Sequence, residues 1–518
     1  MPSLSTLEQT LTTAAAHRLA RYPPLTRQTL STALQEQNLR WQAAPQTLAN
    51  LDRLAEASTV AIVTGQQAGL LGGPALTIWK ILTAIKLAQN LAQRGQSSVP
   101  VFWMASEDHD FDEVEQTTIL APDGTLQTLT CRPSFVGHPA VGEVELDASI
   151  EQMLNTLASA LPTTEFTSGI FEDLRASYLP GRKWCDAFAH WLHRLFAPFG
   201  LIIVDPRDER LRTITQPVFE AIIQRTPDIT NRLVQQAQAY QAQGKSPQVS
   251  VIPSSTTLFL DIDGNRTPLV LDGYRFRPKS NVETSYTKED LLRILRAEPL
   301  RLTPSALLRP VIQDTLFPTV VQVVGPAEMA YLSQSEIIYE AVGIQSPIRW
   351  PRASVTLVEQ RHAKVFAKLG LTPDAAALGK PELLRRAALQ SNDAQIIEYV
   401  NEVKVSFGAQ LDRLKQLLHE ADPSLAEALD RGREKIFHQL NGLEQRFFAS
   451  YAQRDAARTR QIERAITALT PHGQPQERVL NILSFLVKYG PSLLTHSYTK
   501  IDFQTTDHQW ILLEPGRA

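Results

Sequence analysis

Residues 59–105 contain the pattern that most constrains the fold. An apolar, β-branched run at 59–63 is followed by a glycine-rich turn at 65–73, a long helix over 74–94 and a second apolar run at 100–105. Pro74 suits the first position of that helix, where its missing N–H costs nothing. A strand, a crossover helix and a second strand form a βαβ unit, and such units build parallel sheets. We therefore expect an α/β protein with a parallel sheet.

Two further apolar runs extend the predicted sheet. Residues 201–204 and 319–324 are strand-sized, and the second run leads through a Gly-Pro turn into a helix over 327–342. Because these runs lie far apart, the core at 58–356 must carry insertions, which we place near 113–180 and 240–300. In the second insertion, Asp263 and Gly264 separate two β-rich runs, a pattern typical of a hairpin.

The segments on both sides of this core are predicted to be helical. Residues 1–57 favour helices that pack on the core, with a break at Tyr22. Residues 357–475 form a second helical region, in which apolar residues step by three and four on both sides of Asp422. This spacing predicts an antiparallel coiled coil near 391–470. A free apolar face on that arm favours a homodimer, or else the arm packs back on its own core. We expect 476–518 to return to the core.

Composition excludes several classes of protein. A chain of 518 residues exceeds the ~250–300 residues at which single cores stop growing, so at least two units are expected. The formal net charge of −3 gives no support for a nucleic-acid partner or an anionic membrane surface. The two cysteines cannot build a disulfide framework or a four-thiolate zinc site, and they suit a reducing cytosol. No apolar run approaches the ~20 residues that span a bilayer, and residues 1–28 lack a secretory signal, so we expect a cytoplasmic protein.

The glycine-rich turn after the first strand is the first candidate binding site. In open parallel sheets, ligands bind outside the carboxyl ends of the strands, and N–H groups at a helix start attract phosphate or carboxylate. We expect the backbone N–H groups near Gly72 and Gly73 to bind such an anion. The alternative is a structural turn without a ligand. The candidate residues are Thr64, Gly65, Gln66, Gln67, Gly72 and Gly73.

A dense acidic group directly follows the second strand. Glu107, Asp108 and Asp110 flank His109, and such carboxylates repel one another unless a cation or a proton is present. A substrate ammonium group or magnesium with nucleotide phosphates would suit them, and His109 is a candidate general base. The alternatives are an acidic surface loop and the metal site of a hydrolase.

Later segments supply groups suited to anions and amines. Gly325, Glu328 and Tyr331 begin the helix after the third strand, where Glu328 either accepts from a substrate amine or merely caps the helix. Arg309 and Arg352 are suited to clamp carboxylate or phosphate by a bidentate fork, although surface arginines are common.

Polar residues beyond the long helices form a last candidate, a second nucleotide site. Polar groups at a helix start bind anions; alternatively, these side chains fasten the coiled coil to the core. The residues are Gln476, Arg478, Asn481, Lys488 and Tyr489.

Five stretches together resemble one family. They begin at Thr64 (Thr-Gly-Gln-Gln-Ala-Gly-Leu), Ser106 (Ser-Glu-Asp-His-Asp), Arg309 (Arg-Pro-Val-Ile-Gln-Asp), Gly325 (Gly-Pro-Ala-Glu-Met-Ala-Tyr) and Gln476 (Gln-Glu-Arg). In this order, along nearly the whole chain, they resemble the cysteine-adding enzymes of bacillithiol biosynthesis, the BshC family. The resemblance implies a Rossmann-like core with two connecting insertions and a coiled-coil dimerisation domain.

The resemblance also implies a reaction, the addition of L-cysteine to the amine of glucosaminyl malate by a ligase. Because amide formation in water needs an activated carboxylate, we expect ATP or ADP, with magnesium as a candidate and no tightly bound metal. Two alternatives remain open: another nucleotidyltransferase or adenylate-forming enzyme like the class I synthetases, and a coiled-coil scaffold without catalysis. The chain lacks the His-Ile-Gly-His signature of class I synthetases.

We expect the two substrates to meet in one cleft at the carboxyl ends of the strands. Its catalytic group comprises Glu107, Asp108, His109 and Asp110. Its substrate-binding residues are Thr64, Gly65, Gln66, Gln67, Gly72, Gly73, Trp103, Arg309, Gln313, Gly325, Glu328, Tyr331 and Arg352.

Overall fold

The centre of the molecule is a five-stranded parallel sheet in the order β11-β10-β1-β2-β5. The computed structural model describes residues 4–280, 283–391 and 394–514. The strands of the sheet are β1 (Val60–Gln66), β2 (Ser98–Met104), β5 (Ile202–Val204), β10 (Thr319–Val324) and β11 (Ile348–Pro351). The predicted α/β fold with a parallel sheet is therefore confirmed.

The strand order reverses between β1 and β10. From β1 the chain passes through α4 (Leu76–Gln93) to β2 on one side, whereas β10 and β11 lie on the other side. Loops after two such strands diverge and leave a crevice, the switch point, where ligands bind in open parallel sheets. The glycine-rich loop at 66–73 and the turn at Gly325 border this switch point.

Helices cover both faces of the sheet, and successive side chains of β2 point to opposite faces. Val99, Val101 and Trp103 join one core with α2 (Pro24–Arg40) and α8 (Glu209–Ala242). Phe102 and Met104 join another core with α4 and α7 (Trp184–Phe196). The expected N-terminal helices are α1 (Leu4–Arg21), α2 and α3 (Pro45–Ala55), with α1 ending just before Tyr22.

Both insertions contain antiparallel strands. In the first, β3 (Gln116–Leu120) pairs with β4 (Leu126–Thr130), followed by α5 (Ser149–Ala160) and α6 (Thr167–Ser177). The second holds a four-stranded sheet in the order β8-β7-β6-β9. The turn between β6 (Ser255–Ile262) and β7 (Asn265–Asp272) has positive φ at Asp263 (52°) and Gly264 (78°), so the predicted hairpin is confirmed. The other strands are β8 (Arg275–Pro278) and β9 (Leu302–Pro304).

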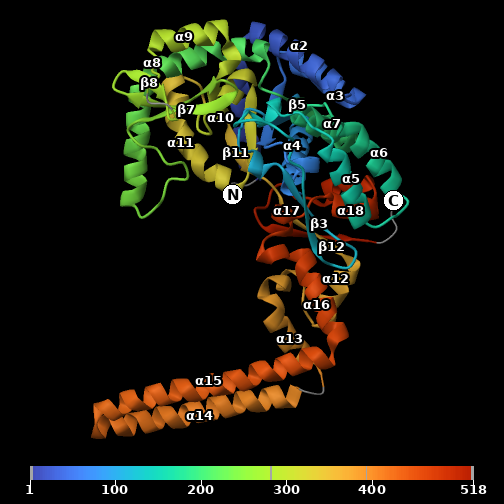
Figure 1. The fold of residues 1–518 in the computed structure, drawn as a ribbon, viewed down its shortest axis with the longest axis vertical. Coiled ribbons are helices and arrows are strands. Elements are labelled where there is room, and N and C mark those ends of the chain that lie inside the picture. Colours follow the sequence, from blue (N-terminus) through green and yellow to red (C-terminus); the bar gives the residue numbers. More distant parts are fainter. Residues whose placement is uncertain (1–3, 281–282, 392–393, 515–518) are drawn as a thin grey trace.

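A long helical hairpin projects from the rest of the molecule (Figure 1). It consists of α14 (Ala394–Ala421) and α15 (Pro423–Arg454), and the side chain of Asp422 caps α15 by accepting the Ser424 N–H at 2.8 Å. The arm ends earlier than the predicted 391–470. Asp455 caps a separate helix, α16 (Ala456–Leu469), which packs against α12 (Gln360–Lys368) and α13 (Gly379–Leu389).

Helices α12, α13 and α16 together form the neck of the molecule. The chain returns to the core after this neck. Strand β13 (His508–Leu513) pairs in parallel with β12 (Ser354–Glu359). Between the neck and β13 lie α17 (Gln476–Val479), α18 (Leu483–Tyr489) and α19 (Ser492–Lys500). Within the described residues, no helix combines the length and the apolar character that crossing a bilayer requires.

Candidate active site

The loop after β1 depends on its glycines. A side chain at Gly65 would approach the Trp103 carbonyl oxygen to 2.9 Å, and Gly72 and Gly73 have φ values of 95° and 70°. The fully buried Asn481 clamps this loop by donating to the Gly73 carbonyl oxygen at 2.9 Å. The loop is therefore held rigidly between the sheet and the C-terminal segment.

The N–H groups of this loop are already engaged. Gly72 donates to the Gly69 carbonyl oxygen and Gly73 to the Leu70 carbonyl oxygen, each at 3.0 Å. The expectation that these two N–H groups bind an anion is therefore wrong, because the loop uses them to close its own turns. The polar groups at this end of β1 are instead the side chains of Gln66, which accepts from Lys80, and Gln67, which donates to Asp108.

Lys80 of α4 lies at the centre of the switch point. Its Nζ donates to the Gly65 carbonyl oxygen at 2.9 Å and to Gln66 Oε1 at 2.7 Å, and it pairs with Glu328. The Lys80 side chain is only 3% exposed. Burial lowers the pKa of Lys80, while Glu328 raises it. The sequence-based site omitted Lys80, although a lysine within the apolar run of α4 is itself a signal.

Two arginines adjoin Lys80 and form with it the cationic cluster (Lys80, Arg309 and Arg352). Both arginines act on the pKa of Lys80 in the same direction as burial, so their charges reach it. Arg352 is buried and donates to Glu477 Oε1 at 2.6 Å. The three cations exceed the two neighbouring carboxylates, Glu328 and Glu477, by one charge. Such a surplus attracts an anionic group.

Glu328 has two roles at the start of α11 (Pro326–Val342). Besides pairing with Lys80, its carboxylate accepts the Gly325 N–H at 2.8 Å, so it also caps the helix. Tyr331, half-buried on the next turn, lies beside Arg309, and burial raises the pKa of Tyr331. These residues therefore lie on the β10 side of the switch point, and their binding of substrate stays a prediction.

Three residues predicted to bind substrate lie inside the core instead. Thr64 is fully buried, and its hydroxyl donates to the Val323 carbonyl oxygen at 2.9 Å, which joins β1 to β10. Gln313 is fully buried and donates to Asp314 Oδ1 at 3.0 Å. Trp103 is 1% exposed and packs under the sheet. Their side chains stabilise the elements that border the switch point and are not exposed to a substrate.

The predicted catalytic group is divided between core and surface. Glu107 is 5% exposed and pairs with Arg212 of α8, which is 2% exposed. Its carboxylate is therefore already neutralised and is not free to hold a substrate ammonium group. Asp110, by contrast, is exposed. Within this group, only Asp108 and His109 are half-buried.

Asp108 is held in its charged form by several partners. Its oxygens accept from Gln67 Nε2 at 3.0 Å and from the His109 N–H at 2.8 Å. Although burial raises the pKa of Asp108, the hydrogen bonds from His109 and Gln67 and the charge of Arg266 hold it well below its usual range. The bond from Gln67 ties the glycine-rich loop to the acidic group.

Arg266 of β7 completes this part of the site from the second insertion. Its Nη1 lies 3.0 Å from His109 Nδ1, and its guanidinium carbon lies 3.9 Å from the centre of the Phe259 ring. Sequence reasoning did not find Arg266 because 157 positions separate it from His109.

The acidic group does not form a metal site built from protein side chains alone. Across residues 4–280, 283–391 and 394–514, no three His, Cys, Asp or Glu side chains are placed to hold one. Arg212 occupies Glu107, and hydrogen bonds occupy Asp108. A magnesium ion held by one or two carboxylates together with nucleotide phosphates stays a prediction.

The five residues of the second predicted site do not face one space. Gln476 is buried; its amide oxygen accepts the Leu357 N–H at 2.8 Å and its amide nitrogen donates to the Leu357 carbonyl oxygen at 3.0 Å, as a neighbouring strand would. Asn481 clamps the glycine-rich loop, and Arg478 is exposed. Lys488 pairs with Glu359 at 3.2 Å. Gln476 and Asn481 therefore fasten chain segments together, which is the structural alternative to a nucleotide site.

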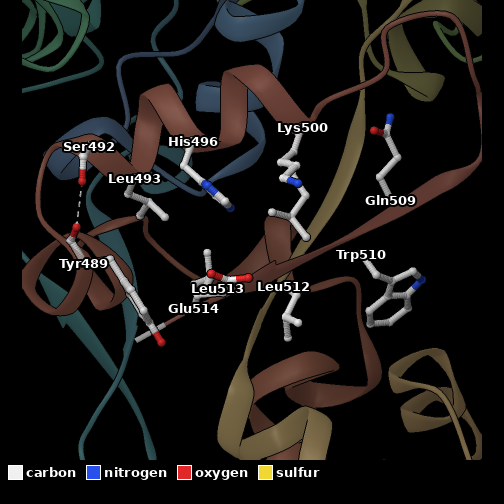
Figure 2. A pocket seen from close by; sticks show the side chains of 11 residues that line it. Tyr489, Ser492, Leu493, His496, Lys500, Gln509, Trp510, Leu512, Leu513 and Glu514 are labelled. Atoms are coloured by element: carbon white, nitrogen blue, oxygen red, sulfur yellow. Dashed lines mark hydrogen bonds between the residues drawn. The ribbon is translucent and has the colours of Figure 1, made fainter. Parts of the chain in front are cut away.

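Tyr489, the fifth of these residues, lines a cavity of about 610 Å³ between α19 and β13 (Figure 2). His496 and Lys500 of α19 and Trp510 of β13 also line it. It shares no lining residue with the cationic cluster, so it is separate from the switch point.

Comparison with known proteins identifies the family. Residues 2–353 match the model described as "Bacillithiol biosynthesis BshC, N-terminal Rossmann-like domain", and residues 355–513 match "Bacillithiol biosynthesis BshC, C-terminal coiled-coil domain". The chain belongs to the BshC family. The Rossmann-like core and the coiled-coil domain that the resemblance implied are thus confirmed.

Two relatives cover most of the chain, and both are named "Putative cysteine ligase BshC". One, from Salinibacter ruber, is 33% identical over 500 residues, which cover 96% of this chain and 90% of the relative. The other, from Koribacter versatilis, is 34% identical over 475 residues, which cover 92% and 88%. A solved structure of Mycobacterium tuberculosis methionyl-tRNA synthetase with methionyl-adenylate is 9% identical, covering 85% of this chain and 91% of that one, with a TM-score of 0.25. A likeness that weak carries no argument.

Proposed function

We propose that this chain is an ATP-driven ligase that joins L-cysteine to the amine of glucosaminyl malate. Membership of the BshC family and the cysteine-ligase name of the relatives support the reaction class. The observation that carries the proposal is the cationic cluster at the switch point of a parallel sheet. The cysteine carboxylate, the malate carboxylates and the phosphates of ATP are all anions that such a cluster attracts.

Each part of the cleft has a role in this reaction. Lys80 joins the loop after β1, through Gln66, to the helix after β10, through Glu328, so it holds both walls in register. Arg309 would orient a carboxylate or phosphate, whereas Arg352, which is already paired with Glu477, would contribute its charge. The rigid walls hold the two reactants in line, which lowers the entropic cost of bringing them together.

The direct test is reconstitution with purified protein, L-cysteine, glucosaminyl malate and ATP. Mass spectrometry should detect the amide product together with one cleaved ATP for each amide formed. AMP with pyrophosphate would indicate an acyl adenylate, and ADP with phosphate an acyl phosphate. If no amide forms with any nucleoside triphosphate while the protein is folded, the proposal fails.

A variant of Lys80 tests whether the switch point is the site. Lys80→Met keeps the length of the side chain and removes its charge and donors. We expect kcat/KM to fall at least about 100-fold, the scale for losing a group that stabilises charge in a protected site. Lys245→Met is the matched control, because Lys245 is exposed and belongs to no part of the cleft. Folded Lys80→Met protein that reacts at the wild-type rate would move the site elsewhere.

We also propose that the arm joins two copies of this chain. Helices α14 and α15 pack along each other, yet large apolar side chains remain on the outside of the pair. A second arm would cover them, as in other coiled coils. The exposed residues are Ile396, Tyr399, Val403, Val405, Leu414, Leu417, Leu425, Ile436 and Leu443.

A further inference from the structure

The contact between Arg266 and His109 determines which ring nitrogen carries a proton. Arg266 Nη1 lies 3.0 Å from His109 Nδ1. A guanidinium group has five N–H donors and no acceptor. Nδ1 must therefore be the acceptor in this hydrogen bond and cannot carry a proton itself. In the neutral ring, the single proton then lies on Nε2.

Arg266 is fixed in this orientation by the second insertion. Its Nε donates to the Thr303 hydroxyl at 3.1 Å, and its Nη2 donates to the Pro304 carbonyl oxygen at 2.8 Å. The guanidinium also stacks on Phe259, and the side chain is only 10% exposed. Three anchors on neighbouring strands therefore direct its remaining nitrogen at the histidine.

Asp108 is the group that competes for the same ring nitrogen. Its Oδ1 lies 3.5 Å from His109 Nδ1 and would favour a proton there. That oxygen, however, accepts the His109 backbone N–H at 2.8 Å, and Oδ2 accepts from Gln67. Arg266 is the nearer partner of Nδ1, at 3.0 Å. Among the described residues, Nε2 has no hydrogen-bond partner, and the side chain is 34% exposed.

We propose that Arg266 is a positioning residue that makes His109 a hydrogen-bond donor through Nε2–H. His109 then donates to an oxyanion or phosphoryl oxygen in the cleft and does not remove the proton from the attacking amine. This role rests on the proposed ligase function, and it replaces the general base expected from the sequence. A positioned donor stabilises the charge that develops on an acyl or phosphoryl oxygen during activation and transfer.

The position of the proton can be measured without any substrate. The full chain is labelled with ¹⁵N-histidine, and the His109 signals are assigned by their loss in His109→Gln. We expect an unprotonated Nδ1 and a protonated Nε2 at neutral pH. A proton on Nδ1 in the wild-type protein overturns the proposal. Since this readout needs no turnover, it stands apart from success or failure of the ligase assay.

Variants of Arg266 test its positioning role by the same signal. Arg266→Met should move the proton toward Nδ1, where Asp108 is the remaining partner, whereas Arg266→Lys should keep it on Nε2. An unchanged proton position in folded Arg266→Met would refute the role. Should Arg266→Met fail to fold, Arg266→Leu is read in the same way, because leucine also lacks a donor.

Two replacements of His109 separate a donor from a base in the ligase assay. The amide of glutamine reaches the position of Nε2, whereas the shorter asparagine reaches that of Nδ1, so His109→Gln alone retains a donor there. We expect kcat to fall about 100-fold in His109→Asn, with KM little changed. In His109→Gln, kcat should fall only about tenfold. Equal losses in both variants would point to a base and overturn the proposal.

Discussion

Glu107→Gln should destabilise the Rossmann-like core. Glu107 and Arg212 are 5% and 2% exposed and pair with each other. Nε and Nη1 of Arg212 have no hydrogen-bond partner within the described residues. Removing the charge of Glu107 therefore leaves a buried guanidinium without its carboxylate partner. Breaking a buried ion pair from one side costs about 3–5 kcal/mol in the free energy of unfolding.

Urea unfolding, followed by tryptophan fluorescence, measures this cost because Trp103 lies buried near the end of β2, which directly precedes the acidic group. The matched control is Asp110→Asn, since Asp110 is exposed and its change should stay within about 0.5 kcal/mol. The double variant Glu107→Met/Arg212→Met should regain much of the stability that Glu107→Gln loses, because apolar replacement of a whole buried ion pair is often neutral.

The opposite pattern would refute this reasoning. If Glu107→Gln unfolds at the wild-type urea concentration and yet loses turnover, Glu107 acts on the substrate and not on Arg212. Glu107 would then rejoin the catalytic group that the sequence suggested.

Three further outcomes are expected. Burial lowers the pKa of His193 to about 3 from 6.5; because only the unfolded chain then binds its proton, the free energy of unfolding should fall by about 2 kcal/mol between pH 7 and 5. His193→Gln should remove this contribution to the slope in urea titrations and leave that of His190, whose pKa burial also lowers; an unchanged slope would contradict it. Asn481→Ala removes the amide that donates to the Leu71 and Gly73 carbonyl oxygens; it should cost about 1–3 kcal/mol and raise KM, whereas unchanged kinetics would argue against a clamp. Replacing exposed Leu414 and Leu417 by glutamate should give monomers by light scattering, with dimers persisting if another surface joins the copies.

Most of the fold could be predicted from local patterns. The apolar runs, the glycine-rich turn and the helix at 59–105 specify a βαβ unit because each element forms from neighbouring residues. The Asp263-Gly264 hairpin and the arm around Asp422 follow for the same reason. The end of the arm could not be predicted, because the helical pattern continues through Asp455 and only packing in the neck separates α16 from α15.

The candidate site was decided by contacts between distant parts of the chain. The sequence placed its carboxylates, glutamines and histidine beside two strands, yet their partners come from elsewhere: Lys80 and Glu328 are 248 positions apart, and Arg212 and Glu107 are 105 apart. Burial and pairing determine whether a charged side chain is free to act. Both depend on which surfaces the tertiary fold brings together. The fold pairs Glu107 with Arg212 in the core and places Arg266 against His109.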